Sequence, residues 1–221
     1  GNISSAGVVR FVKKTLNAEK IGHAGTLDPF AEGVLICCLN QATRLAGFLL
    51  HAKKKYAAVL KLGEETDTQD FTGTIVSTTK PVDVSPQTIN TVFNKFEGPI
   101  KQLPPVYSAL KHKGVPLYKL ARRGKPMQKP PRCVQIYNIT IQEIALPLIG
   151  FEVTCSAGTY IRTLCADIGK SLGCGGHLTA LKRLESSGFT LSQAVSLSEL
   201  EKLRNSTDLT KRIIRMADAL P

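Results

Sequence analysis

Asp28 is the residue whose type and surroundings most clearly suggest chemistry. It lies in the segment GHAGTLDP, residues 22–29, where two glycines and an Asp-Pro pair predict a loop. A carboxylate held in such a loop can act as a nucleophile. The same pair is also typical of an ordinary turn, because aspartate accepts hydrogen bonds from nearby main-chain N–H groups and proline fixes φ. From the loop alone, both interpretations stay open.

Arg162 and Tyr56 are two further residues that could take part in such a reaction. Arg162 follows Tyr160 in GTYIRT, and its guanidinium stays charged and can hold a carboxylate with two hydrogen bonds. Tyr56 follows three lysines and could stack on a nucleobase. Pattern alone favours plainer interpretations, namely an arginine in the first turn of a helix and a half-buried aromatic residue of a sheet.

The sequence contains no recognisable binding motif for a metal or a cofactor. Its six cysteines form no CxxC pair and have no His-x-His companion, so neither a zinc site nor a redox motif is indicated. It contains no glycine-rich phosphate loop of the GxGxxG or GxxxxGK[ST] kind. We therefore expect a cofactor-free protein with reduced, structural thiols.

The charge balance indicates a polyanionic partner. There are 29 Lys and Arg against 17 Asp and Glu, a formal net charge of +12. Such a field suits nucleic acid, although a basic face can also simply be solvated. No apolar run reaches the roughly 18 residues of a membrane helix, and no signal peptide opens the chain. We expect a cytoplasmic protein without a membrane partner.

The elements that would position these residues can be read from the hydrophobic pattern. Helices are expected behind Ser4 and Ser5, over 43–50, from Ser85-Pro86 to Gly98-Pro99, from Ala157-Gly158 to Gly173, and last over 197–203. Strands are expected over 34–39, 56–62, 74–78, 133–144, 148–155 and 178–184, with loops over 21–29 and 63–73. This mixture favours an α+β sheet protein over a doubly wound fold, with residues 1–221 as one catalytic domain.

Residues 101–131 differ from the rest of the chain. They contain six prolines and little periodic apolar signal, and we interpret them as an inserted, basic, loop-rich arm. Its basic side chains would suit backbone phosphates: Lys111, Lys113, Lys119, Arg122, Arg123 and Lys125. A mobile, solvated loop is the alternative, and both hold if the arm orders on RNA.

Four blocks of the sequence together carry a resemblance. They are KIGHAGTLDPFAEGVL; the run from Lys55-Tyr56 to Leu62-Gly63 with the following TDTQDFTG; LPPVYSALKHKGVPLYKLARRG; and CSAGTYIRTLCADIGKSLGCGGHLTALKRL. In content and order these blocks, about four-fifths of the chain, resemble the TruB family of tRNA pseudouridine-55 synthases. The resemblance implies the pseudouridine synthase fold, a mixed, largely antiparallel sheet flanked by helices. The arm resembles the family's thumb insertion, which closes over the tRNA stem-loop.

The resemblance implies a reaction for the three candidate residues. Asp28 attacks a flipped-out uridine of the T-loop, position 55, so that uracil detaches, rotates and rejoins the ribose through carbon; attack on the base and attack on the sugar both stay open. The family places Arg162 against this aspartate, where it offsets the cost of burying an ionised carboxylate. Tyr56 stacks on the uracil, as suits a flipped base.

The resemblance also implies contacts for other residues. Tyr160 and Leu181 match positions that line the base pocket, and His23 matches a position that packs against the RNA. Asp70 could orient the basic groups of the pocket, although an Asx turn explains it nearly as well. Arg44 stands where the family often has lysine, and it could keep a phosphate contact.

The whole enzyme is expected to be a monomeric isomerase that binds the tRNA T stem-loop without an obligatory protein partner. The family often carries a C-terminal RNA-binding domain, which we expect to be absent here. Two alternatives stay open: a tRNA-binding and folding chaperone module, and a subunit of an RNA-guided pseudouridine synthase.

Overall fold

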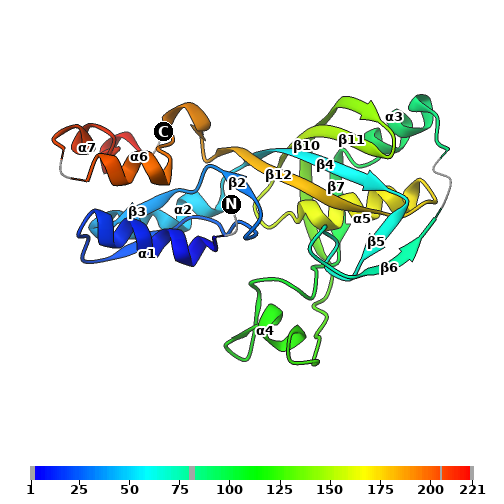
Figure 1. Cartoon of the computed structure of the whole chain (residues 1–221), viewed down its shortest axis with the longest axis horizontal. Helices are drawn as coiled ribbons and strands as arrows, with labels where there is room; N and C mark the ends of the chain where they lie inside the picture. The colour runs from blue at the N-terminus through cyan, green and yellow to red at the C-terminus, as the bar shows by residue number, and fades with distance from the viewer. Residues whose placement is uncertain (1–2, 80–82, 205, 220–221) are drawn as a thin grey trace. The chain divides into compact units, whose positions relative to one another are not determined.

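The computed structural model describes residues 3–79, 83–204 and 206–219, and the chain divides into two compact units. Unit 1 comprises residues 1–52 and 183–221, and unit 2 comprises residues 53–182. Strand β12 (Gly176–Ser186) runs from the end of unit 2 into unit 1. Figure 1 labels the elements of both units.

A largely antiparallel sheet forms the centre of unit 2. Its strands lie in the order β12, β4, β11, β10, β7. Antiparallel pairs join β4 (Lys54–Leu62) to β11 (Leu148–Cys155), β11 to β10 (Arg132–Ala145), and β10 to β7 (Gly98–Gln102). Along β4, buried and half-buried side chains alternate, as expected for a strand with one face on the core. Tyr56 belongs to the buried set and pairs with Val153 of β11.

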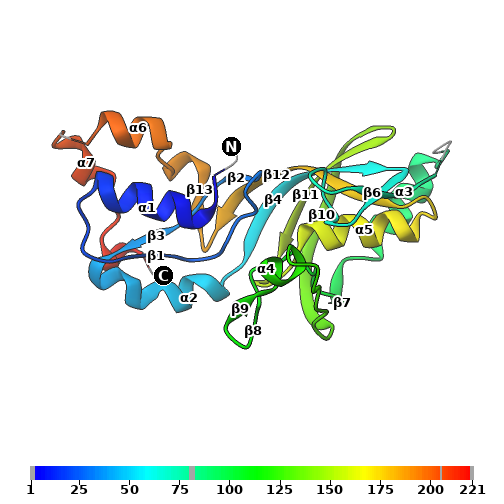
Figure 2. The same ribbon diagram turned by 60° about the horizontal axis from the view of Figure 1, so that its bottom comes forward.

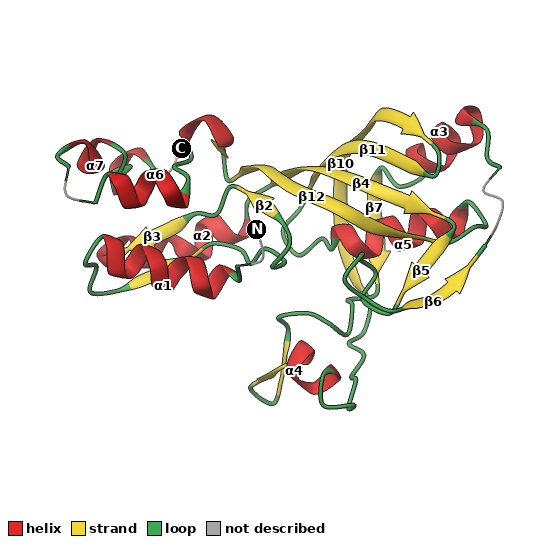
Figure 3. Ribbon diagram, viewed as in Figure 1, coloured by secondary structure: helices red, strands yellow, loops and turns green. Residues whose placement is uncertain are grey.

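Helices α3 (Pro86–Asn94) and α5 (Ile161–Ser171) pack on this sheet (Figure 3). Phe93 of α3 meets Phe151 of β11 edge to face, with ring centroids 5.4 Å apart. Helix α5 approaches the chain so closely that a Cβ at Gly169 would lie 2.4 Å from the main-chain nitrogen of Gly176. Only glycine allows that approach, and as a result α5 packs directly against the start of β12.

Residues 103–131 leave the sheet between β7 and β10 and form an arm (Figure 1), whereas residues 101 and 102 of the predicted arm still belong to β7. The arm holds the short strands β8 (Lys111–His112) and β9 (Val115–Pro116) and one helix, α4 (Leu117–Ala121). Leu117, the first residue of α4, is fully buried, and Gln128 Nε2 donates to Pro104 O at 2.6 Å. The arm therefore has a small core and is not a bare loop.

Unit 1 packs its helices around a two-stranded ribbon. Strand β1 (Ile21–His23) pairs antiparallel with β3 (Cys37–Leu39), and Figure 2 shows α1 (Ser5–Thr15) and α2 (Ala46–His51) on either side of it. Strands β2 (Glu32–Gly33) and β13 (Phe189–Thr190) pair with β12. The remaining elements are the 3-10 helices η1 (Asn40–Leu45), η2 (Leu191–Gln193) and η3 (Met216–Asp218), the hairpin β5 (Glu64–Thr66) and β6 (Ile75–Thr78) of unit 2, and helices α6 (Leu197–Lys202) and α7 (Asp208–Lys211).

The α+β class, with its largely antiparallel sheet and flanking helices, is confirmed. Several boundaries predicted from the sequence are wrong. The loop over 21–29 begins with strand β1, the loop over 63–73 contains β5, the strand over 34–39 is reduced to β3, and α7 follows the helix expected to be last. Two- and three-residue strands have no periodicity of their own and form because a partner strand pairs with them. No helix in the described part of the chain is long and apolar enough to cross a membrane.

Candidate active site

Asp28 is half-buried in the loop that joins β1 to β2. Its main-chain oxygen accepts a hydrogen bond from Ala31 N at 3.0 Å, so the turn expected from the Asp-Pro pair is present. Ser5, the first residue of α1, holds the neighbouring Leu27: Leu27 N donates to Ser5 Oγ at 2.9 Å, and Oγ donates to Leu27 O at 3.3 Å. A side chain of α1 therefore fixes the main chain next to the candidate nucleophile.

His23 ends strand β1, five residues before Asp28. Its Nδ1 is buried and has no hydrogen-bond partner among the residues that the structure describes. Burial lowers the pKa of His23 below its ordinary value; the Gly25 main chain opposes this effect, and the positive charge of Arg183 adds to it. The imidazole is therefore neutral near pH 7, which suits packing against a partner better than proton transfer.

Arg162 lies in the first turn of α5 and is almost completely buried. Its Nη1 donates to Thr68 O at 2.9 Å, its Nη2 donates to Tyr107 O at 3.0 Å, and its Nε lies 3.6 Å from Asp70 Oδ2. The other oxygen of Asp70, Oδ1, accepts from Thr68 Oγ1 and from Thr72 N, both at 2.9 Å. Asp70 therefore closes an Asx-type turn and also forms an ion pair with the guanidinium.

Tyr160 precedes α5, and a buried glutamine fixes its main chain. Gln102 is completely buried at the end of β7; its Oε1 accepts from Tyr160 N at 2.9 Å, and its Nε2 donates to Tyr160 O at 3.1 Å. The guanidinium of Arg132 lies over the Tyr160 ring, 5.4 Å from its centroid, within cation–π range. The root of the arm thus sets both the position and the ring environment of Tyr160.

The other candidate residues divide between the two units. Tyr56 and Leu181 are buried on the neighbouring strands β4 and β12 of unit 2. Arg44 is exposed in η1 of unit 1, as a phosphate contact requires. Unit 2 therefore holds Tyr56, Asp70, Tyr160, Arg162 and Leu181, and unit 1 holds His23, Asp28 and Arg44. The pairing of Arg162 with Asp28 and the roles of all eight residues stay predictions.

Three residues with a bearing on the site were missed from the sequence: Ser5, Gln102 and Arg183. Ser5 and Gln102 act through main-chain groups far away in the sequence, and nothing near them signals this. Arg183 left one signal, because it occupies an inward position of β12, two residues after the buried Leu181. A charged residue at an inward position of a strand is rare unless it is paired or hydrogen-bonded.

The basic side chains of the arm, which we proposed as phosphate contacts, are all exposed: Lys111, Lys113, Lys119, Arg122, Arg123 and Lys125. Arg122 also lies over the ring of Tyr118 at 5.7 Å. The prolines and the small core around α4 hold this positive surface on an ordered scaffold. An RNA backbone could therefore bind it without the whole arm having to fold first.

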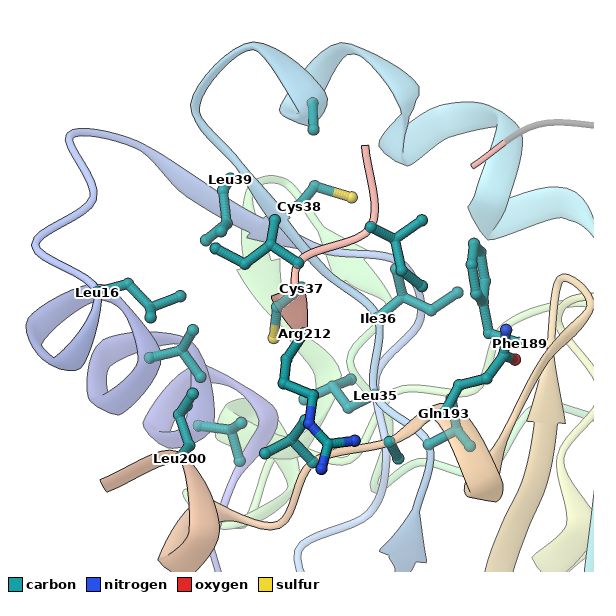
Figure 4. A pocket seen from close by; sticks show the side chains of 18 of the residues that line it. Leu16, Leu35, Ile36, Cys37, Cys38, Leu39, Phe189, Gln193, Leu200 and Arg212 are labelled. Atoms are coloured by element: carbon teal, nitrogen blue, oxygen red, sulfur yellow. The ribbon is translucent and has the colours of Figure 1, made fainter. Parts of the chain in front are cut away.

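Unit 1 also contains an apolar cavity of about 880 Å³, shown in Figure 4. It lies among α1, β3 and α6 and is bordered by neither Asp28 nor His23. Two thiols lie there; burial raises the pKa of Cys37 to about 11 and also raises that of Cys38, so both are neutral at physiological pH. In the described residues, no group of three or more His, Cys, Asp or Glu side chains could hold a metal ion.

Comparison with known sequences identifies the class. The profile of the TruB family pseudouridylate synthase (N-terminal domain) matches residues 13–161, and that of the tRNA pseudouridylate synthase B C-terminal domain matches residues 162–220. The chain belongs to the TruB family of pseudouridylate synthases. The resemblance drawn from the sequence is confirmed, and with it the assignment to an enzyme class.

Curated relatives cover nearly the whole chain. It is 48% identical to tRNA pseudouridine synthase B of Syntrophus aciditrophicus (strain SB) over 98% of the chain and 69% of the relative. It is 44% identical to the protein of the same name from Geobacter sulfurreducens over 99% of the chain and 72% of the relative. These relatives are longer than the chain, which spans about seven-tenths of each.

Solved structures give the same fold. A Cbf5-Nop10-Gar1 complex contains a chain that matches with a TM-score of 0.77 and 33% identity over 98% of this chain. An archaeal box H/ACA sRNP Nop10-Cbf5 complex matches with a TM-score of 0.72 and 31% identity. This chain spans 57% of each of those longer chains.

Proposed function

We propose that this chain isomerises the T-loop uridine of tRNA, position 55, to pseudouridine. The observation that carries the proposal is the 44–48% identity, over 98–99% of the chain, to relatives named tRNA pseudouridine synthase B. The net charge of +12 and the exposed basic arm support an RNA substrate. The reaction is an intramolecular transfer, so it needs no cofactor.

Asp28 is the nucleophile in this proposal. Attack by its carboxylate on the base or on the sugar allows the bond between uracil N1 and ribose C1′ to break. The freed ring rotates and forms a bond between C5 and C1′, and the bond to Asp28 breaks again. C5 loses its hydrogen as a proton and N1 gains a proton, so the product is an isomer of the substrate. The fixed turn around Asp28, tied to α1 through Ser5, supports this role because a nucleophile must be held in one place.

Arg162 is the fixed cation that keeps the nucleophile ionised. Removal from water raises the pKa of a carboxylate, and a positive charge nearby lowers it again. The hydrogen bonds of the Arg162 guanidinium to Thr68 O and Tyr107 O support this role, because they fix its orientation without neutralising it. Asp70 at 3.6 Å then orients the guanidinium.

The remaining residues bind the substrate. Tyr56 stacks on the flipped uracil, and Tyr160 and Leu181 line the pocket around it. His23 packs against the RNA as a neutral ring, Arg44 binds a phosphate, and the arm closes on the T stem-loop. Phosphate contacts of this kind position the RNA without reading its sequence.

The proposal is tested with a bare transcript of tRNA and the purified chain. Pseudouridine is quantified by chromatography and mass spectrometry of nucleosides and located by chemical derivatisation and primer extension. We expect one pseudouridine per transcript, at position 55, and none in a matched transcript with cytidine there. Absence of product from folded tRNA and folded protein would overturn the proposed activity.

The same assay separates two alternatives. The solved neighbours described as Cbf5 complexes favour an RNA-guided subunit as the second candidate, and such a subunit would need guide RNA and accessory proteins. Product from the bare transcript excludes that requirement. A tRNA-folding module without chemistry would bind and refold the transcript but leave its uridine unchanged.

The oligomeric state and the location of the protein complete the proposal. We expect a monomer without an obligatory protein partner, acting in the cytoplasm where tRNA is processed. Analytical ultracentrifugation of the chain, alone and with one equivalent of tRNA, tests the first expectation: a single species of about one chain mass, and then a 1:1 complex.

A further inference from the structure

Arg183 is a buried cation that the proposed mechanism does not use. It is completely buried in β12, and no ion pair joins it to a carboxylate in the described part of the chain. Its Nη1 is also buried and has no hydrogen-bond partner among those residues. Burial of a charge costs free energy unless its other donors form hydrogen bonds, so the contacts of the other two nitrogens indicate what this residue stabilises.

Those two nitrogens bind the main chain on both sides of the Asp28 turn. Arg183 Nη2 donates to Gly25 O at 3.2 Å, and Nε donates to Val34 O at 2.7 Å. The main chain of Arg183 adds a third link, since Val34 N donates to Arg183 O at 2.9 Å. One residue of β12 therefore holds both ends of the segment 25–34.

The shape of this segment depends on the same strand. Gly33 has φ +104°, and a Cβ there would lie 2.1 Å from Arg183 O, so glycine alone permits the approach of β2 to β12. The planar guanidinium then fixes the separation of the Gly25 and Val34 carbonyls, because its donors form a rigid fork. A lysine, with one nitrogen on a flexible stem, cannot set that separation.

We propose that Arg183 is a positioning residue for the reaction: by holding the Gly25 and Val34 carbonyls it fixes the loop that carries Asp28. The inference rests on the proposed role of Asp28 as nucleophile. Arg183 touches neither substrate nor the reacting atoms in this account. Its contribution is to keep the Asp28 carboxylate within reach of its target, and a misplacement of about 1 Å can cost about 100-fold in rate.

The test uses two variants of Arg183 and one matched control. Arg183→Met keeps an unbranched apolar stem but has no donors, and Arg183→Lys keeps the charge with a single nitrogen. Val12→Ala removes a buried side chain of α1 in the same unit but none of the hydrogen bonds that hold the segment 25–34. For each variant we measure the melting temperature, the dissociation constant for tRNA, the single-turnover rate, and hydrogen exchange of the Leu27 and Ala31 amides, both hydrogen-bonded in the loop.

We expect Arg183→Met to lose about 100-fold or more in single-turnover rate, with the dissociation constant for tRNA changed by less than about threefold. Arg183→Lys should lie between Arg183→Met and the unmodified chain, and it replaces Arg183→Met if that variant does not fold. Exchange of both loop amides should accelerate at least tenfold in the Arg183 variants and stay unchanged in Val12→Ala, even where Val12→Ala melts lower.

Three results would overturn the inference: unchanged exchange in the loop, faster exchange without a loss of rate, or an equal loss of rate in Val12→Ala at equal melting temperature. The exchange measurement does not depend on activity. If the unmodified chain made no pseudouridine, the proposed function would fail, while the exchange data would still decide whether Arg183 holds the loop.

Discussion

Replacement of Gln102 gives a quantitative test of how the candidate site is built. Its completely buried amide satisfies the Tyr160 N–H and shares the Tyr160 carbonyl with Leu164 N, which donates to the same oxygen at 3.0 Å. Gln102→Leu keeps the side-chain volume roughly constant but removes both hydrogen bonds. The Tyr160 N–H is then buried without a partner, whereas the carbonyl keeps one.

The expected decrease in the free energy of unfolding follows from these two hydrogen bonds. An orphaned buried donor costs about 1–3 kcal/mol, and the lost bond to a carbonyl that keeps another partner costs about 0.5–1.5 kcal/mol. The free energy of unfolding should therefore fall by roughly 3 kcal/mol, which lowers the melting temperature by about 6–12 °C for a chain of this size. Arg162 lies in the first turn of α5, two residues after Tyr160. A displaced Tyr160 main chain should therefore also displace Arg162 and lower the single-turnover rate.

Gln102→Glu adds a dependence on pH with a defined sign. An ionised carboxylate accepts from Tyr160 N but cannot donate to Tyr160 O, whereas a protonated one does both. The folded state therefore favours the protonated form, so the stability of this variant is greatest at acidic pH and is lost as pH rises. Its deficit relative to the unmodified chain should shrink as pH falls.

Calorimetric melting and urea unfolding at several pH values measure both variants. Gln87→Leu is the control, because Gln87 is exposed on α3 and its replacement should change stability by less than about 0.5 kcal/mol. The reasoning is refuted if Gln102→Leu is as stable as Gln87→Leu, or if the deficit of Gln102→Glu grows as pH falls.

Three further predictions concern other parts of the chain. Burial raises the pKa of Asp167, and the positive charge of Lys170 partly opposes this effect, so ionisation of Asp167 destabilises the fold as pH rises. Asp167→Asn should therefore raise the melting temperature near pH 7, and this gain should disappear at acidic pH. A gain that is the same at every pH would contradict this prediction. Gly169→Ala should lower the free energy of unfolding by about 1–3 kcal/mol, because the added Cβ meets the main chain of Gly175 and Gly176. Gly47→Ala, at a position of α2 with open space around it, should stabilise the fold slightly. Equal urea midpoints for the two variants would contradict this prediction. Iodoacetamide at pH 8 should label the exposed Cys133 well before buried thiols of high pKa such as Cys155, whose pKa burial raises to about 11, as peptide mass spectrometry can show. Equal labelling of the two would contradict this.

The sequence predicted those elements whose own pattern suffices. Strands β4, β10, β11 and β12 and helices α1, α3 and α5 have long apolar patterns or clear caps, such as Ser85 Oγ accepting from Thr88 N at 3.1 Å. The sequence predicts loop at strands β1 and β5, because a strand of three residues shows no hydrophobic periodicity. Their pairing with β3 and β6 comes from the tertiary structure alone.

The candidate site divides in the same way. The chemistry proposed for Asp28, Tyr56 and Arg162 comes from the resemblance, because it depends on side-chain type and local motif. The residues that hold the main chain around the candidate site could not be predicted from the sequence. Gln102 binds a main-chain oxygen 58 residues away along the chain, and Arg183 binds two that are more than 100 residues away. Carbonyl groups are present at every residue, so no sequence motif marks the one that a distant side chain selects.

Release of tritium from tRNA labelled at uracil C5 tests the central claim most directly, since C5 must lose its hydrogen when it bonds to the ribose. Single-turnover release is measured for the unmodified chain, for Asp28→Asn, and for Glu32→Gln, which neutralises an exposed carboxylate at the start of β2, the strand that follows the Asp28 loop. We predict that Asp28→Asn abolishes release, by at least about 10⁴-fold, while it still binds tRNA, and that Glu32→Gln releases tritium at the unmodified rate. Release by Asp28→Asn at the rate of Glu32→Gln would contradict the account.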